Sequence, residues 1–145
     1  MVRRDYLQNQ IDLLGRVLGK VLADLLGLKN TGEINEGIKV TYQALKEELN
    51  IDLEELLKLS NEDFIHEIQT VHKFNSYNLE ILAEILFVIS EQTFNKKLLE
   101  NETLSIHLKS IALFQYVEKL ENTYSFERNL KIDQLKKRLQ ILLES

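Results

Sequence analysis

The segment from Arg3 to Leu28 carries the longest regular apolar stripe in the chain. Its apolar residues follow one another in alternating steps of four and three, and they are Leu7, Ile11, Leu14, Leu18, Val21 and Leu25. This spacing places their side chains on one side of an α-helix. Further apolar residues, Leu13, Val17, Leu22 and Leu26, widen the stripe beyond one face. We therefore predict a helix from about Arg4 to Leu26, with other helices packed on two of its sides.

Proline is absent from all 145 residues, and there are only five glycines. These are the two residue types that helix interiors exclude, so the chain is predicted to be all-α, without strands. We find no linker that would divide it, and we predict a single helical domain over residues 1–145. The long helices and short turns indicate five to seven helices, arranged as stacked antiparallel hairpins in a tetratricopeptide-like or an irregular bundle.

Turn and cap residues place the remaining helices. The first helix ends in a turn from Gly27 to Gly32, and a second helix follows from about Glu33 to Leu49. Asp52 and Ser60 are the predicted N-caps of two shorter helices. A helix over 78–94, capped by Ser76 or Asn78, has apolar residues almost all round and is predicted to be the most buried. A polar connection over 95–102 leads to a helix over 102–122, and Ser125 caps the last helix.

The predicted inward faces of the last two helices come from their apolar spacing. For the helix over 102–122 these residues are Leu104, Leu108, Ile111, Ala112, Tyr116 and Leu120. For the last helix, Ile132, Leu135, Leu139 and Leu142 keep a spacing of three, four and three. Such a stripe can close the bundle or pair with another chain.

Two stretches resemble tetratricopeptide-type hairpins, in which small residues let two helices approach closely. After the turn glycine Gly32, the small positions are matched by Gly37 and Ala44, whereas Thr41 occupies the aromatic position and Tyr42 lies one residue away from it. Ser110, Phe114 and Val117 repeat the spacing more loosely. With the opening RRDYLQNQIDLLGRVL and the segment NIDLEELLKLSNEDF, the chain resembles a family of small bacterial all-helical proteins of unknown function. The resemblance implies a bacterial, cytoplasmic helical protein and brings no catalytic residue, metal ligand or cofactor.

The sequence contains no recognisable set of catalytic or metal-binding residues. His66 and Glu67 begin like a zinc-protease motif, but the next histidine is His72, six positions on instead of four, so the two imidazoles cannot share a metal from one helix. We expect solvated or capping histidines, no cofactor and no enzymatic activity. Gly15 and Gly19 lie four apart on the first helix, which indicates either a close helix contact or a ligand groove.

The charge pattern restricts the classes of molecule that this protein is expected to bind. The net charge of −5 opposes general attraction to nucleic acid and to anionic lipid. The basic run Lys136, Lys137 and Arg138 has no interleaved aromatic residues, so we expect a solvated face, or attraction to the acidic stretch over 47–67, and no nucleic-acid binding. No apolar run is long enough to span a bilayer, and neither a signal peptide nor a cysteine is present, which favours a cytoplasmic protein.

These observations favour a helical module that binds a peptide or helix from an unidentified partner protein in a groove between hairpins. The alternative is a structural homodimer that associates through the Leu7 to Leu25 stripe or the Ile132 to Leu142 stripe. The third hypothesis is a helical bundle that binds a small ligand. Arg3, Arg4 and Tyr6 precede the first stripe and have no predicted structural role, so they are candidate partner contacts.

Overall fold

The computed structural model describes residues 2–97 and 100–144, with side chains described from residue 5 onward. Over these residues the chain forms seven α-helices and no strand, which confirms the predicted all-α fold. The helices are α1 (Val2–Thr31), α2 (Ile34–Leu49), α3 (Leu53–Leu56), α4 (Asn61–Thr70), α5 (Ser76–Lys96), α6 (Glu100–Glu121) and α7 (Phe126–Glu144).

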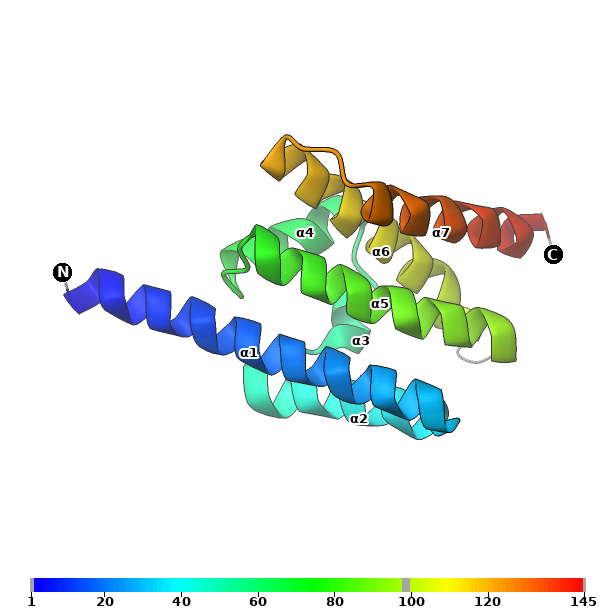
Figure 1. Cartoon of the computed structure of the whole chain (residues 1–145), viewed down its shortest axis with the longest axis horizontal. Helices are drawn as coiled ribbons and strands as arrows, with labels where there is room; N and C mark the ends of the chain where they lie inside the picture. The colour runs from blue at the N-terminus through cyan, green and yellow to red at the C-terminus, as the bar shows by residue number, and fades with distance from the viewer. Residues whose placement is uncertain (1, 98–99, 145) are drawn as a thin grey trace.

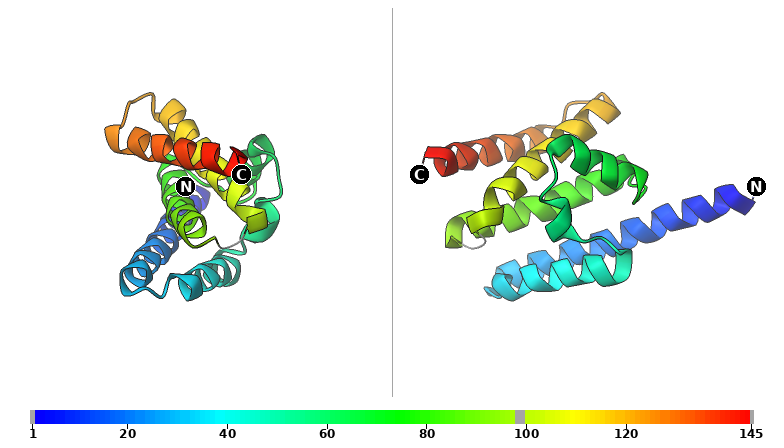
Figure 2. Two further views of the ribbon diagram at one scale, coloured as in Figure 1. Left: turned by 90° about the vertical axis from the view of Figure 1, so that its right-hand side faces the viewer. Right: turned by 180° about the vertical axis from the view of Figure 1, so that it is seen from behind.

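Two antiparallel helical hairpins lie side by side in this structure. Helices α1 and α2 form the first hairpin, α5 and α6 form the second, and α1 packs against α5 where the two hairpins meet (Figure 1). Helix α7 folds back along α6, and the short helices α3 and α4 connect the hairpins on the other side, with α4 packed on α6 (Figure 2). The buried apolar side chains of all these helices belong to one core cluster.

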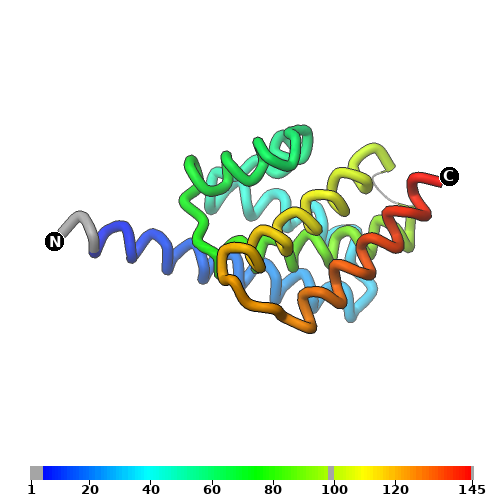
Figure 3. Tube along the Cα trace, turned by 90° about the horizontal axis from the view of Figure 1, so that it is seen from above, coloured from blue at the N-terminus to red at the C-terminus, as the bar shows by residue number. Residues whose placement is uncertain are grey.

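The N-terminal part of α1 extends beyond the other helices (Figure 3). The predicted stripe is buried from Leu14 through Leu25, and Leu18 is completely covered. At the start of the stripe the prediction was wrong, because Leu7 is 46% exposed and no helix of the described chain lies beside it. Leu13, which was expected to widen the buried face, is 53% exposed, although Glu48 and Leu49 at the end of α2 line a hollow beside it. An apolar face therefore continues past the body of the protein.

Helix α1 is longer than predicted and ends at Thr31 instead of Leu26. Gly27 lies within the helix, where a single glycine weakens but does not interrupt the main-chain hydrogen bonds. The turn is made at Gly32, whose φ of 81° is a conformation that side chains other than glycine rarely adopt. The connection to α2 is correspondingly short.

Small residues on α2 allow it to lie close to α1. A Cβ on the buried Gly37 would lie 2.9 Å from Leu28 Cδ1, too close for any atom to fit without movement. Thr41, one turn later, is also buried, and its hydroxyl donates a hydrogen bond to the carbonyl of Gly37 at 2.8 Å. Gly37, a small position of the sequence pattern, thus marks a close helix contact.

Three of the four predicted helix caps are confirmed. The side chains of Asp52, Ser60 and Ser125 accept hydrogen bonds from main-chain N–H groups three residues later. The cap of α5 is Asn75 and neither Ser76 nor Asn78, since Asn75 Oδ1 accepts the N–H of Asn78 at 2.9 Å. Helix α5 therefore begins two residues earlier than the apolar pattern indicated.

Helix α5 is the most buried helix of the described chain, as predicted, but the inward face of α6 was predicted only in part, since Ile111 is buried and Tyr116 packs partly buried against the core. Leu104 is 36% exposed and Leu120 is 47% exposed. The buried face of α6 contains polar residues that apolar spacing does not detect, namely Thr103, His107 and Ser110. Ser110 Oγ donates to the carbonyl of Ala83 on α5 at 3.0 Å, which offsets the cost of burying its hydroxyl.

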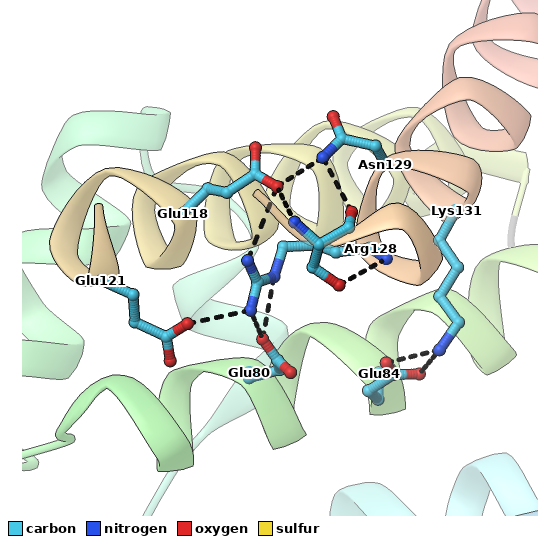
Figure 4. Close-up of polar contacts among 8 residues, drawn as sticks. Glu80, Glu84, Glu118, Glu121, Arg128, Asn129 and Lys131 are labelled. Carbon is cyan, nitrogen blue, oxygen red and sulfur yellow. Dashed lines mark hydrogen bonds and ion pairs between the residues drawn. The ribbon is translucent and has the colours of Figure 1, made fainter. Parts of the chain in front are cut away.

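A cluster of charges fixes α7 to the second hairpin (Figure 4). The guanidinium of Arg128 is 6% exposed and donates to Glu80 on α5 at 2.5 Å and to Glu121 on α6 at 3.1 Å. Lys131, one turn further along α7, pairs with Glu84 at 2.5 Å. The basic residues of the last helix therefore meet acids of α5 and α6 in these pairs, and not the acidic stretch over 47–67.

The basic run further along α7 is divided between solvent and protein. Lys136 and Lys137 are exposed, as expected for a solvated face. Arg138 is partly buried, with its guanidinium 5.3 Å from the centre of the Phe87 ring. Its role is structural, because it packs on α5 and also takes part in hydrogen bonds described below.

Candidate functional site

A groove with a volume of about 700 Å³ lies between α1 and the start of α5. One wall is a single face of α1, where residues recur at steps of three and four and are Asn9, Asp12, Gly15, Arg16 and Gly19. The other wall is the first turn of α5 and the loop residue before it, with Asn75, Tyr77 and Asn78. Most of the lining side chains are polar, and Ile11 supplies an apolar one.

The two glycines of α1 have different surroundings in this groove. A Cβ on Gly15 would lie 3.0 Å from Asn78 Oδ1 and 3.6 Å from Tyr77 Cε1, so the absence of a side chain lets α5 approach α1. A Cβ on Gly19 would have no atom within 4 Å. Of the two predictions made for the glycine pair, the close helix contact applies at Gly15, and an open groove lies at Gly19.

Asn78 is the most unusual residue of the groove. Its side chain is 1% exposed, and neither Nδ2 nor Oδ1 has a hydrogen-bond partner among the described residues. The cap of α5 uses only the main-chain N–H of Asn78, which donates to Asn75. Burying a carboxamide without partners costs about 1–3 kcal/mol in proteins. The groove thus contains an amide whose donor and acceptor are both unused within the described chain.

The groove has one cation and one anion. Arg16 forms no hydrogen bond or ion pair with the described residues, while Asp12 Oδ1 accepts a hydrogen bond from Gln8 at 3.1 Å. Because these charges balance, the groove does not attract polyanions. Its polar groups suit a neutral ligand with both donors and acceptors.

No family model, curated protein or solved structure matches this chain.

Of the residues that the sequence singled out as partner contacts, Tyr6 does not line this groove. The side chains of Arg3 and Arg4 lie outside the described residues. Tyr6 lies on the projecting part of α1, is 61% exposed, and its hydroxyl accepts a hydrogen bond from Gln10 Nε2 at 3.0 Å. It is accessible to a partner, two to three turns from Gly15 along the same helix.

Sequence reasoning missed Asn75 and Asn78 as functional candidates, because Asn78 was interpreted only as a helix cap. A signal was nevertheless present. Asn78 precedes Leu82, Ile85 and Ile89 at steps of four, three and four, so it occupies a position of the buried stripe of α5. A polar residue in such a stripe needs a partner.

The expectation that the histidines are solvated or capping is wrong for His107, which is completely buried. His107 Nδ1 donates to the Thr103 carbonyl at 2.7 Å, and Nε2 accepts from Arg138 Nε at 3.3 Å. The pKa of His107 is lowered by burial and by the charge of Arg138, although the Thr103 hydrogen bond opposes this shift. Arg138 also donates to Ser90 at 3.2 Å, so these residues join α5, α6 and α7.

The histidines do not form a metal site in the described part of the chain. No group of three or more His, Asp or Glu side chains suited to a metal ion is present there. His66 is exposed, and burial lowers the pKa of the partly buried His72. Among the same residues, no helix has the length and apolar character needed to cross a bilayer.

A second hollow, of about 730 Å³, lies at the other end of the molecule, where the end of α7 meets α5 and α6. Its apolar lining includes Phe94, Leu104 and Ile141. The buried hydroxyls beside it are satisfied, because Thr93 and Thr103 hydrogen-bond to each other at 2.8 Å. The groove between α1 and α5 remains the stronger candidate, since it alone of these two contains a buried polar group without a partner in the described chain.

Proposed function

We propose that this protein is a non-enzymatic interaction module that binds a segment of a partner protein in the groove between α1 and α5. The observation that carries the proposal is the bare main chain at Gly19, which faces open space and, unlike the equally open Gly27, lines the groove. A helix glycine costs about 1 kcal/mol relative to alanine. No contact within the described chain offsets that cost, whereas a bound segment would gain from the close approach that glycine permits.

The charge of the protein supports a protein partner. A net charge of −5 opposes binding to nucleic acid or to an anionic membrane surface, and the groove adds no excess of positive charge. An open, largely polar groove of about 700 Å³ is shallow for a small apolar ligand, which prefers an enclosed apolar pocket. The chain has no cysteine, which suits a reducing compartment, and we place the interaction in the cytoplasm.

Photo-crosslinking from the groove tests this proposal. A photoreactive residue in place of Arg16 is expected to capture a discrete partner from the native lysate. The same residue in place of the exposed Lys137, on α7, is the control and is expected to capture none. Equal capture from both positions, or none from either, would contradict the proposal.

A matched pair of glycine variants shows whether capture depends on the groove. Gly19→Leu fills the groove, while Gly27→Leu adds the same side chain to the same helix at a position that also has no atom within 4 Å of its Cβ and does not line the groove. Capture from position 16 is expected to disappear in the first variant and to persist in the second. Loss in both would indicate a general effect on α1.

Self-association is the second candidate, and the exposed stripe on the projecting part of α1 favours it. Leu7 is 46% exposed there, and a short helix without tertiary contacts is marginal in water, so covering this face would stabilise it. A second copy of the chain could provide the cover. Light scattering distinguishes the candidates, because a mass near 17.0 kDa at all micromolar concentrations would exclude the dimer.

A further inference from the structure

The unpaired amide of Asn78 narrows the kind of segment that the groove accepts. Its Nδ2 and Oδ1 have no hydrogen-bond partner among the described residues, and its side chain is 1% exposed. A leucine, which has nearly the same shape, would avoid the cost of an unpaired buried amide. The carboxamide therefore does not serve the packing of this chain, and it lies at the groove that Gly15 and Gly19 form.

A carboxamide presents a donor and an acceptor side by side, and its best complement is another amide. The peptide group is the amide that every protein segment carries, but in a helix its N–H and C=O are already bonded within the helix. An extended segment leaves both groups free. We propose that the groove binds an extended segment of the partner protein and that the Asn78 carboxamide hydrogen-bonds to the N–H and C=O of one residue of that segment, since these two groups point to the same side of an extended chain. This inference rests on the function proposed above and specifies the conformation and recognition of the ligand.

The dimensions of the groove suit such a segment. From Asn9 to Gly19 the wall formed by α1 has a length of about 15 Å, at 1.5 Å per residue. An extended chain rises about 3.3 Å per residue, so the groove holds about four or five residues. Two further carboxamides, Asn9 and Asn75, line the same groove, and Asn75 uses its Oδ1 as the helix cap. The free amide hydrogens of these residues can serve neighbouring carbonyls of the segment.

Access to Asn78 requires a local movement, because its amide atoms are covered. The ring of Tyr77 lies 3.6 Å from the Cβ position of Gly15, next to Asn78, yet the residue is 66% exposed. An exposed aromatic side chain changes rotamer within nanoseconds. In the bound state the Tyr77 ring turns away from Gly15, and the segment replaces it against α1.

A ligand without side chains tests the recognition directly. The probe is N-acetyl-triglycine N-methylamide, and its control is the analogue in which every N–H carries a methyl group. NMR of the whole chain follows the side-chain amide signals of Asn78 during titration. The triglycine probe is expected to shift these signals saturably, and the methylated analogue, which keeps its carbonyl acceptors but cannot donate to Oδ1, is expected to bind more weakly and to shift them less.

Two variants accompany this titration, and binding to them is followed through the main-chain amide signals of Gly15 and Gly19, because Asn78→Leu has no side-chain amide. Asn78→Leu is expected to weaken binding of the probe about tenfold, the equivalent of about 1.4 kcal/mol. Asn35→Leu, which replaces an exposed asparagine on α2, is expected to bind the probe like the wild type. Equal binding by the wild type and the Asn78 variant would overturn the inference. So would a buried water molecule that stays bound to the Asn78 amide at saturating probe.

The inference and the proposed function fail in different ways. Suppose that the photoreactive residue at position 16 captures a partner segment. If that segment is helical, or if it binds the Asn78→Leu variant as tightly as the wild type, the groove is an interaction site and the inference is wrong. If the probe shifts the Asn78 signals and the photoreactive residue at position 16 captures no protein, Asn78 recognises amides and the proposed function is wrong.

Discussion

Asn78 Oδ1 on α5 lies 3.0 Å from the position that a Cβ on Gly15 of α1 would occupy. This relationship joins the two hairpins and at the same time leaves a groove beside the contact, because the next glycine, Gly19, has no atom within 4 Å of its Cβ position. One helix face thus supplies both the close contact and the open surface.

The two glycines should respond differently to alanine. Gly19→Ala is expected to raise the free energy of unfolding by about 1 kcal/mol, because alanine favours the helix and its methyl group meets nothing. Gly15→Ala should gain little or lose stability, since its methyl group would press on Asn78. Urea unfolding measures both changes, with Gly27→Ala as a control that should behave like Gly19→Ala. Equal changes at positions 15 and 19 would contradict the described contact.

Asn78→Leu is expected to stabilise the protein. The substitution removes an unpaired buried amide, whose cost is about 1–3 kcal/mol, and preserves the side-chain shape and the main-chain cap hydrogen bond. Thermal and urea unfolding should both show the increase. Asn75→Ala is the contrasting variant and should lose about 1 kcal/mol, because it removes the N-cap of α5. A destabilised Asn78→Leu protein would show that its amide has a partner in solution.

The outlines of the helices were predictable because capping and apolar spacing are local properties. Asp52, Ser60 and Ser125 each precede a helix and cap it as expected. The end of α1 was not predictable in the same way, since Gly27 is compatible with both a turn and a helix. Leu7 is exposed because α1 extends beyond the helices that pack on it. The apolar stripe of α1 does not indicate how long those other helices are.

The candidate site was predictable only in part. The spacing of Gly15 and Gly19 indicated a bare helix face, and the structure shows which glycine is covered and which is open. Asn78 was not recognised because cap residues and buried polar residues share the same amino acid types. The buried face of α6 was missed in part for a related reason, as His107 and Ser110 are polar residues that hydrogen-bond to neighbouring helices, His107 to Arg138 on α7 and Ser110 to Ala83 on α5.

Arg128 is expected to be the most important charged residue for stability among those of α7. Arg128→Ala should lower the free energy of unfolding by about 2–3 kcal/mol, because it removes charged hydrogen bonds to Glu80 and Glu121 from a guanidinium that is 6% exposed. Lys137→Ala, at an exposed position of the same helix, should change stability by no more than about 0.5 kcal/mol. Similar effects of the two substitutions would contradict a structural role for the cluster.

Acidification is expected to destabilise the protein through His107. Its pKa is lowered in the folded chain, whereas an unfolded histidine has a pKa near 6.5, so the unfolded state binds more protons between these two values. The free energy of unfolding therefore falls as the pH decreases below about 6.5 and gains nothing from this group at higher pH.

Comparison of unfolding at pH 7.5 and pH 5.5 measures this dependence. His107→Gln cannot take up the proton and should show a smaller loss of stability on acidification than the wild type. Burial also lowers the pKa of His72, so part of the dependence should remain in this variant. An unchanged pH dependence would show that His107 does not titrate as described.

The central claim is that the groove between α1 and α5 binds a partner segment, and the most direct measurement is the affinity of the crosslinked segment for two leucine variants. By calorimetry, Gly19→Leu should bind the segment at least about tenfold more weakly than the wild type, while Gly27→Leu should bind it unchanged. If Gly19→Leu binds as tightly as the wild type, the groove is not the binding site.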